Sequence, residues 1–228
     1  MRDDNVVMAG IKSSFPILLG YLPIGVAYGL LAVKSGLNLI ETTSMSIFVF
    51  AGSAQLICVN MIGAGTTVFP IISMTFLVNL RHILMSASLS LNFRKTPSKY
   101  LPFLGFIITD ESFAVGKTYF DNYDRKGLFF LSLGITAYLG WVFSSIFGAL
   151  LGSLFPITDL PGLDFVLPAM FIVLLIMQMD NRKEIFVAII SAVFSLIFIY
   201  ILPDNWNIIT ATILAATIGV FLEREGQY

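Results

Sequence analysis

The chain has 228 residues, of which 57% are hydrophobic and only 12% are charged, whereas about a quarter are charged in soluble proteins. With a mean hydropathy of +0.89, this composition excludes a soluble globular domain and predicts an integral membrane protein. The net charge of −1 provides no basic field for nucleic acid, so nucleic acid is not an expected partner.

Eight hydrophobic segments are long enough to cross a bilayer core about 30 Å thick, which takes roughly 20 helical residues. They cover residues 14–33, 43–62, 67–93, 100–120, 128–155, 163–179, 185–202 and 206–222. The connections are short, and none has the composition of a linker or a soluble domain. The sequence therefore predicts an all-α polytopic helical bundle of about seven or eight segments, with residues 1–228 forming a single integral membrane domain.

Lys and Arg residues in the connections predict the orientation in the membrane. For eight simple crossings they number seven on one side and four on the other, which places both termini in the cytoplasm by the positive-inside rule. The basic loops at 94–99 and 125–126 then fall on opposite sides. This conflict disappears if residues 101–119 re-enter without crossing and one of the first three segments does likewise.

The first segment contains Pro23, which cannot donate a backbone hydrogen bond to Leu19 and should kink or break the helix. A break at membrane depth could line a substrate path, which makes Pro23 and Gly25 candidate substrate-binding residues. Alternatively, Gly25 and Gly29 form a small face that lets another helix pack closely. The sequence leaves both interpretations open.

In the second segment, Gly52 and Ser53 leave the backbone accessible, and Gln55 places an amide near the middle of an apolar run. A buried amide needs a hydrogen-bond partner. An interhelical hydrogen bond would satisfy Gln55, and contact with substrate would do so as well. All three residues are candidate substrate-binding residues.

The third segment carries both a polar stripe and a cation. On a continuous helix, an arc of about 80° would hold Thr75, Asn79, His82, Ser86 and Ser90. We expect this stripe to face a cavity, with Asn79 and His82 as candidate substrate-binding residues. His82 could also join a proton relay, because histidine titrates near neutral pH, or could be a packing residue. Arg81 points away from the stripe and needs its own counter-ion, because a cation at this depth costs roughly 3 kcal/mol.

The fourth segment offers that counter-ion. Asp110 and Glu111 are acids at comparable depth, and we expect one of them to pair with Arg81. Burial favours the protonated form of the other carboxylate, which could then load and release a proton. The alternative is a purely architectural ion pair.

Enzyme signatures are missing. The chain has no metalloprotease, nucleophile-elbow or Walker motif, and one histidine with one cysteine does not make a zinc site. Adjacent acids on one helix point about 100° apart, which is poor geometry for an aspartyl dyad. We expect no enzymatic activity, no metal and no organic cofactor.

Four motifs in order resemble the AzlC family of branched-chain amino acid export permeases, the large subunits of two-component LIV-E-type exporters. They are "PIGVAYG" (23–29), "FAGSAQ" (50–55), "NLRH" (79–82) and "TDESF" (109–113), and length and hydropathy agree along the chain. The resemblance implies secondary export of branched-chain or other hydrophobic amino acids across the inner (cytoplasmic) membrane, with a small AzlD-like membrane subunit as partner. It assigns no binding residues, so those named above rest on residue chemistry.

Export against a gradient needs an energy source, and without a nucleotide motif the natural source is an ion gradient, here of protons. Two alternatives stay open: a non-transporting membrane scaffold or assembly protein, and a passive channel for small solutes. Saturable, proton-coupled flux would distinguish a transporter from both.

Overall fold

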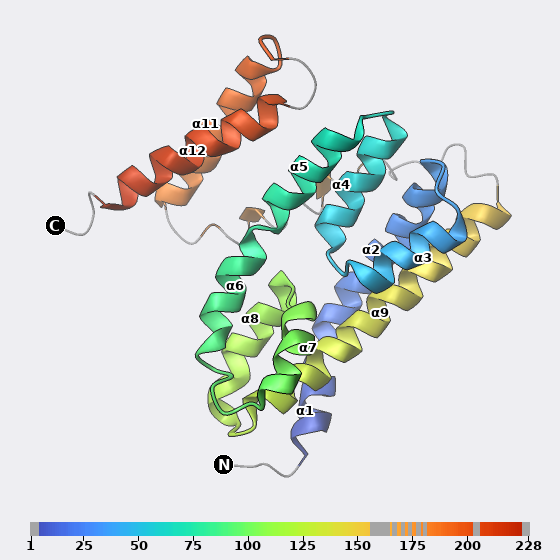
Figure 1. Ribbon diagram of the computed structural model, residues 1–228, viewed down its shortest axis with the longest axis vertical. Coiled ribbons are helices and arrows are strands. Elements are labelled where there is room, and N and C mark those ends of the chain that lie inside the picture. The colour runs from blue at the N-terminus through green and yellow to red at the C-terminus, as the bar shows by residue number, and fades with distance from the viewer. Residues whose placement is uncertain are drawn as a thin grey trace.

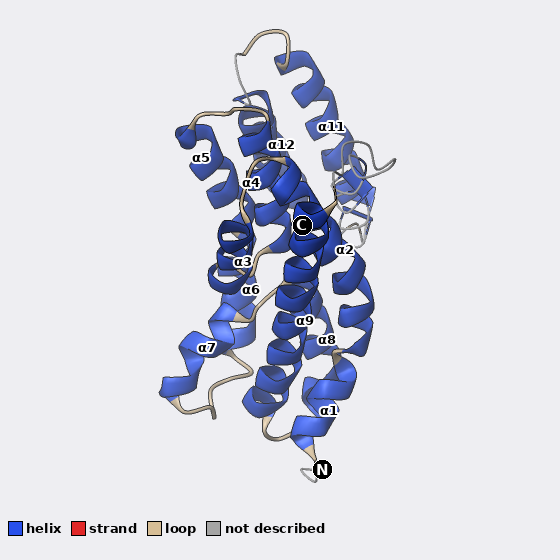
Figure 2. Ribbon diagram, turned by 90° about the vertical axis from the view of Figure 1, so that its right-hand side faces the viewer, coloured by secondary structure: helices blue, strands red, loops and turns tan. Residues whose placement is uncertain are grey.

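The computed structural model describes residues 5–155, 182–202 and 206–224, with isolated residues at 165, 168, 169, 172, 175, 176 and 179. Every regular element in this part of the chain is helical (Figure 2), which confirms the all-α class. The predicted segment 163–179 lies largely outside the described residues. The total number of segments therefore stays a prediction.

The helices do not follow the predicted segments one for one. In chain order they are α1 (Val6–Ser13), α2 (Phe15–Lys34), α3 (Leu39–Phe48), α4 (Gly52–Gly63), α5 (Val68–Asn79), α6 (Arg81–Ser90), α7 (Leu101–Phe106), α8 (Asp110–Tyr119), α9 (Lys126–Leu154), α11 (Arg182–Phe198) and α12 (Trp206–Arg224). Short 3-10 turns at Ser98–Tyr100 and Phe120–Asn122 precede α7 and follow α8. Among the described residues, three spans are long and apolar enough to cross a membrane: α2, α5 with α6, and α9.

The helices α2 and α9 run parallel and form the centre of the molecule (Figure 1). Their backbones touch at glycines: a side chain at Gly29 would meet the carbonyl oxygen of Ser145, and one at Gly148 would meet that of Val26. Helix α2 continues through Pro23, so of the predicted kink or break, the break does not occur. Its glycines serve close packing, which is the second of the two interpretations drawn from the sequence.

The segment predicted at 43–62 is a helical hairpin that enters from one end of the bundle and returns to it. Helix α3 ends at Phe48 and α4 begins at Gly52. The far end of α4 comes back beside the end of α2, because a side chain at Gly63 would lie 2.8 Å from the Ser35 hydroxyl. The tip lies beside Trp141, near the middle of α9.

The segment predicted at 100–120 is a second hairpin, which enters from the opposite end (Figure 1). The residues at its two ends meet, since the rings of Phe93 and Phe120 are 5.7 Å apart. Its tip, residues 107–109, lies against Gly134 of α9. The two basic loops therefore lie at the same end of the bundle, as a re-entrant segment requires.

The arrangement of a long span followed by a re-entrant hairpin occurs twice, in opposite directions. Helix α2 is followed by the α3–α4 hairpin, and the α5–α6 span is followed by the α7–α8 hairpin (Figure 1). Inverted repeats of this kind are common in secondary transporters. The two units show no sequence similarity from which the repeat could be predicted.

Helices α11 and α12 pack against each other as an antiparallel pair. The amide of Asn207, at the start of α12, lies 3.4 Å from the carbonyl oxygen of Ser195, near the end of α11. Farther along, Gly219 faces Val187.

Candidate functional site

The tips of the two hairpins and the junction of α5 with α6 meet at one small cavity, which we call the central cavity. These three places are residues 49–51 between α3 and α4, Leu80 between α5 and α6, and residues 107–109 between α7 and α8. The cavity measures about 50 Å³ and is lined by Tyr21, Ile24, Phe50, Ala51, Gly52, Ser53, Arg81, His82, Thr109, Asp110, Glu111 and Trp141. It lies where the tips of the two hairpins approach each other.

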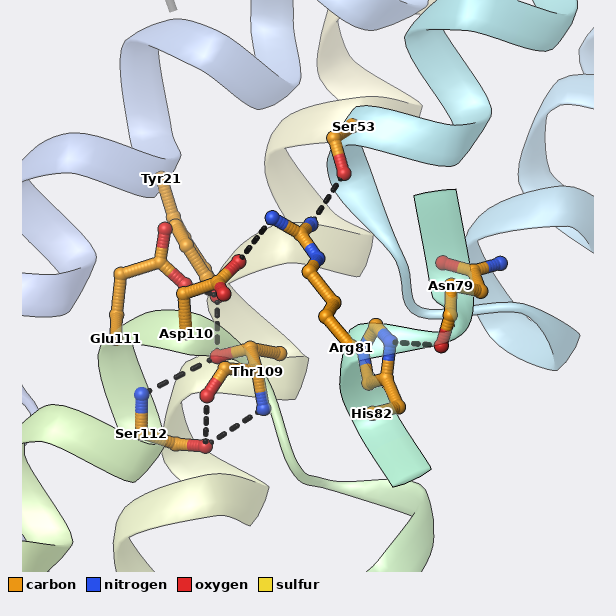
Figure 3. Close-up of polar contacts among 9 residues, drawn as sticks. All are labelled: Tyr21, Ser53, Asn79, Arg81, His82, Thr109, Asp110, Glu111 and Ser112. Atoms are coloured by element: carbon orange, nitrogen blue, oxygen red, sulfur yellow. Dashed lines mark hydrogen bonds and ion pairs between the residues drawn. The ribbon is translucent and has the colours of Figure 1, made fainter. Parts of the chain in front are cut away.

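Arg81 joins the two hairpins across this cavity (Figure 3). Its Nη1 lies 2.8 Å from Oδ2 of Asp110, at the start of α8, and the two side chains are 26% and 24% exposed. Its Nη2 donates a hydrogen bond to the hydroxyl of Ser53, in the first turn of α4. Its Nε is buried and has no hydrogen-bond partner. Within the described residues, the guanidinium thus has N–H groups to spare, the one on Nε among them.

Glu111 has a different partner from Asp110. The hydroxyl of Tyr21, on α2, donates to Oε2 of Glu111 at 2.7 Å and lies 2.8 Å from Oγ1 of Thr109. Of the two acids that the sequence offered to Arg81, the structure therefore pairs Asp110 with the cation and leaves Glu111 with a neutral donor.

A capping box fixes the start of α8. Thr109 accepts a hydrogen bond from the backbone N–H of Ser112, and the Ser112 hydroxyl accepts one from the N–H of Thr109. Asp110 and Glu111 then occupy the first helical turn, where the helix dipole favours negative charge. The local sequence thus sets both carboxylates at the cavity edge.

Gln55 is fully buried behind the cavity rather than on its wall. Its Nε2 donates to the Ser46 hydroxyl at 3.1 Å, and its Oε1 accepts from Nε1 of Trp141 at 3.0 Å. These bonds tie α4 to α3 and to α9. The structure thus gives Gln55 the interhelical hydrogen bonds that the sequence offered as the alternative to substrate contact.

Of the polar stripe expected along residues 67–93, only His82 lines the central cavity. Helix α5 ends at Asn79 and α6 begins at Arg81, although Leu80 between them keeps helical backbone angles. Arg81 and His82 both reach the cavity, whereas Asn79 lies behind His82, with its backbone oxygen 3.2 Å from Nδ1 of the imidazole (Figure 3).

On α2, the cavity wall is formed by Tyr21 and Ile24, while the predicted Pro23 and Gly25 lie outside it. The sequence did not predict Tyr21 or Ile24 as cavity residues. It also did not predict Phe50, Ala51, Thr109 and Trp141. Thr109 carried a readable signal, because a threonine followed by two acids is a typical helix start. The aromatic residues carried none, since in an apolar segment they read as packing.

Helices α4 and α8 both begin at the cavity wall, with Gly52 and Asp110 as their first residues. Helix amino ends carry partial positive charge and bind anions. Together with the spare Nε of Arg81 they can hold a carboxylate, while Glu111 can accept an ammonium. No group of three His, Cys, Asp or Glu side chains in the described ranges is placed to hold a metal ion.

The family model described as "AzlC protein" matches residues 16–155, well over half of the chain. The chain belongs to the AzlC family. The match contains α2 to α9, and hence every residue of the central cavity.

Relatives agree with this family assignment. The branched-chain amino acid transport protein AzlC of Bacillus subtilis is 31% identical over 226 residues, which cover 96% of this chain and 87% of the relative. An uncharacterized membrane protein of Helicobacter pylori is 32% identical over 82% of this chain and 84% of its own length. The inner membrane protein YgaZ of Escherichia coli is 27% identical over 78% and 75%. No solved structure matches the chain significantly.

Proposed function

We propose that this protein is a secondary transporter that exports branched-chain or other hydrophobic amino acids across the cytoplasmic membrane. The proposal rests on one observation: the tips of two hairpins and the α5–α6 junction converge on a polar cavity around the Arg81–Asp110 ion pair, within an apolar bundle. Secondary transporters bind substrates at interrupted helices. The name of the B. subtilis relative, a branched-chain amino acid transport protein, supports the substrate class.

Arg81 is the proposed receptor for the substrate carboxylate. Its Nη atoms are engaged by Asp110 and Ser53, but its buried Nε is a free donor. The amino end of α4 adds partial positive charge on the same wall. A carboxylate bound there would make charge-assisted hydrogen bonds in a site largely screened from water.

Glu111 is the proposed receptor for the substrate ammonium and for the coupled proton. Its present partner is only a tyrosine hydroxyl, which an ammonium can replace. An ammonium and a proton would compete for the same carboxylate. Competition of this kind produces antiport, because a proton arriving from outside displaces the amino acid, and an amino acid from the cytoplasm displaces the proton.

The arrangement corresponds to a closed state. A cavity of about 50 Å³ has room for a few water molecules but not for a branched-chain amino acid. Arg81 holds both tips, through Ser53 on α4 and through Asp110 on α8. Each hairpin enters from a different end of the bundle. Releasing Arg81 from Ser53 would free the α4 tip, and releasing it from Asp110 would free the α8 tip, so the cavity could open toward one end or the other, as alternating access requires.

The basic end of the bundle is proposed to face the cytoplasm. The loops that carry Arg94, Lys95, Lys99, Arg125 and Lys126 lie there, and α1 begins there, whereas Lys34 lies at the other end of α2. The positive-inside rule then places the amino terminus in the cytoplasm.

The α5–α6 span is the proposed contact for a small AzlD-like subunit. It is far less buried than α2 or α9, and large side chains such as Phe76 and Leu84 are 62% and 74% exposed. A second membrane subunit could cover this face.

The test is counterflow of labelled valine in proteoliposomes, with and without the AzlD-like subunit. We expect saturable exchange that Arg81→Gln abolishes and that Gly20→Ala leaves unchanged, since no atom lies within 4 Å of a side chain added at Gly20. Flux that rises linearly with valine would indicate a channel instead. No flux with the subunit present would indicate a scaffold.

The coupling ion is tested separately. In Glu111→Gln proteoliposomes, a pH gradient should no longer drive valine uphill. Exchange without a gradient should require a higher valine concentration, because the variant also lacks the proposed ammonium receptor. If the gradient still drives accumulation in this variant, Glu111 is not the proton site.

A further inference from the structure

A second and larger cavity opens at the basic end of the bundle, and we call it the basic cavity. It measures about 970 Å³ and lies between residues 91–100 and residues 121–131. None of its lining residues lines the central cavity. The proposed transport mechanism leaves it without a role.

Packing beneath the basic cavity fixes its two walls relative to each other. The ring of Phe93, on one wall, lies 5.7 Å from Phe120 and 5.3 Å from Phe130 on the other. A side chain added at Gly127 would collide with the side chain of Thr96, so the two walls pack closely there. The cavity is thus built into the fold and does not depend on flexible loops coming together.

The charges around this cavity are unbalanced. Its basic lining residues are Arg94, Lys95, Arg125 and Lys126, and its acidic ones are Asp121 and Asp124. Lys126 is 3.3 Å from Oδ1 of Asp121. Within the described part of the chain, the other three cations form no ion pair. Guanidinium groups bind phosphate oxygens in a bidentate manner, so an excess of cations that includes two arginines suits a phosphate group.

The remaining walls are apolar or aromatic. Leu91 is 64% exposed and Tyr100 is 40% exposed, and Leu128, Leu131 and Tyr123 complete this part of the lining. A phosphate attached to a hydrocarbon chain would satisfy both parts of the surface. Basic pockets beside membrane helices have this composition where they hold anionic lipid headgroups.

From these observations we infer that the basic cavity binds a phosphate group, carried by the headgroup of an anionic phospholipid. Arg94, Lys95 and Arg125 hold the phosphate, and the leucines and tyrosines contact the glycerol and upper acyl region. Free inorganic phosphate has the same chemistry at the cationic part of the site. A bound lipid would bridge the α6–α7 connection to the start of α9.

The test is native mass spectrometry of the full-length protein in detergent, with added phosphatidylglycerol or phosphatidylcholine. We expect phosphatidylglycerol adducts to persist and phosphatidylcholine adducts to be lost. The triple variant Arg94→Gln, Lys95→Gln, Arg125→Gln should weaken phosphatidylglycerol binding by roughly a hundredfold, because each basic residue near a membrane surface contributes about a fivefold factor. These side chains are exposed, so the variant should fold.

A charge-matched control replaces Lys12, Lys34 and Lys117 by glutamine, none of which lines the basic cavity. It should bind phosphatidylglycerol as the unmodified protein does. Equal loss in both triple variants, or no loss in either, would overturn the inference.

A second arm adds inorganic phosphate alone and measures the melting temperature. A rise that is absent in the cavity variant would support a phosphate site open to the soluble anion. Lipid binding without such a rise would support the headgroup as the ligand. If neither phosphatidylglycerol nor phosphate binds, the site does not exist.

Discussion

Gly29→Ala should destabilise the protein even though alanine is the better helix former by up to about 1 kcal/mol. The added methyl would meet the carbonyl oxygen of Ser145 and the amide nitrogen of Ala149, and would lie 2.8 Å from the carbonyl carbon of Gly148. All three are backbone atoms of α9 and cannot rotate away. Overpacking costs about 1–3 kcal/mol, and immovable neighbours favour the upper limit. The net loss is then about 2 kcal/mol.

The assay is thermal unfolding in detergent, followed by the amount of monodisperse protein. For a chain of this size, about 2 kcal/mol corresponds to a fall in Tm of roughly 4–8 °C. Gly20→Ala, on the same helix, is the matched control, because a side chain there meets no atom within 4 Å. Its Tm should stay the same or rise. If Gly29→Ala melts at or above the Tm of Gly20→Ala, the close contact of α2 and α9 is not as described.

Trp141→Phe leaves the buried Oε1 of Gln55 without its donor and should cost about 1–3 kcal/mol, measured as a lower Tm; an unchanged Tm would mean that the bond does not form. Tyr21→Phe removes the one side-chain donor that the described residues supply to a cavity carboxylate outside the ion pair. The apparent affinity for valine in counterflow should therefore change, while expression and Tm stay close to those of the unmodified protein. An identical affinity would argue against a role for that hydroxyl. On a cysteine-free background, Ser98→Cys and Asn122→Cys should react with an impermeant thiol reagent from the same side of the membrane, and labelling from opposite sides would contradict the α7–α8 hairpin.

The sequence predicted where the apolar segments lie, but it did not predict which of them reverse direction part-way through. Hydropathy located α2 and α9 to within a few residues, because long apolar runs have few alternatives in a membrane. Hydropathy could not locate the reversal at residues 49–51, because the chain stays apolar through it and contains no proline there. At residues 107–109 it was equally uninformative, although Thr109 and the acids after it indicate a helix start. Charge was more informative than hydropathy there, since only a re-entrant segment places both basic loops at one end.

Within the site, the sequence separated two neighbouring residues that the structure brings to one cavity. Helical counting placed Arg81 and His82 on different faces, yet both line the cavity, because the tips of both hairpins lie beside the start of α6. The partner of Arg81 could be narrowed to two adjacent acids. The choice between them required the orientation of α8, which is set by the capping box at Thr109.

Phe50, at the tip of the α3–α4 hairpin, has a φ of +39°, in the left-handed region that side chains other than glycine avoid at a cost of about 1–2 kcal/mol. Its ring is held among those of Tyr21, Phe106 and Tyr138, at centroid distances of 6.3, 6.2 and 5.1 Å. Aromatic packing therefore keeps this backbone in a conformation that it would otherwise leave. A movement that withdraws the ring would let the backbone relax. The strain at Phe50 therefore makes the free-energy gap between the proposed closed and open states smaller than the contacts alone would make it.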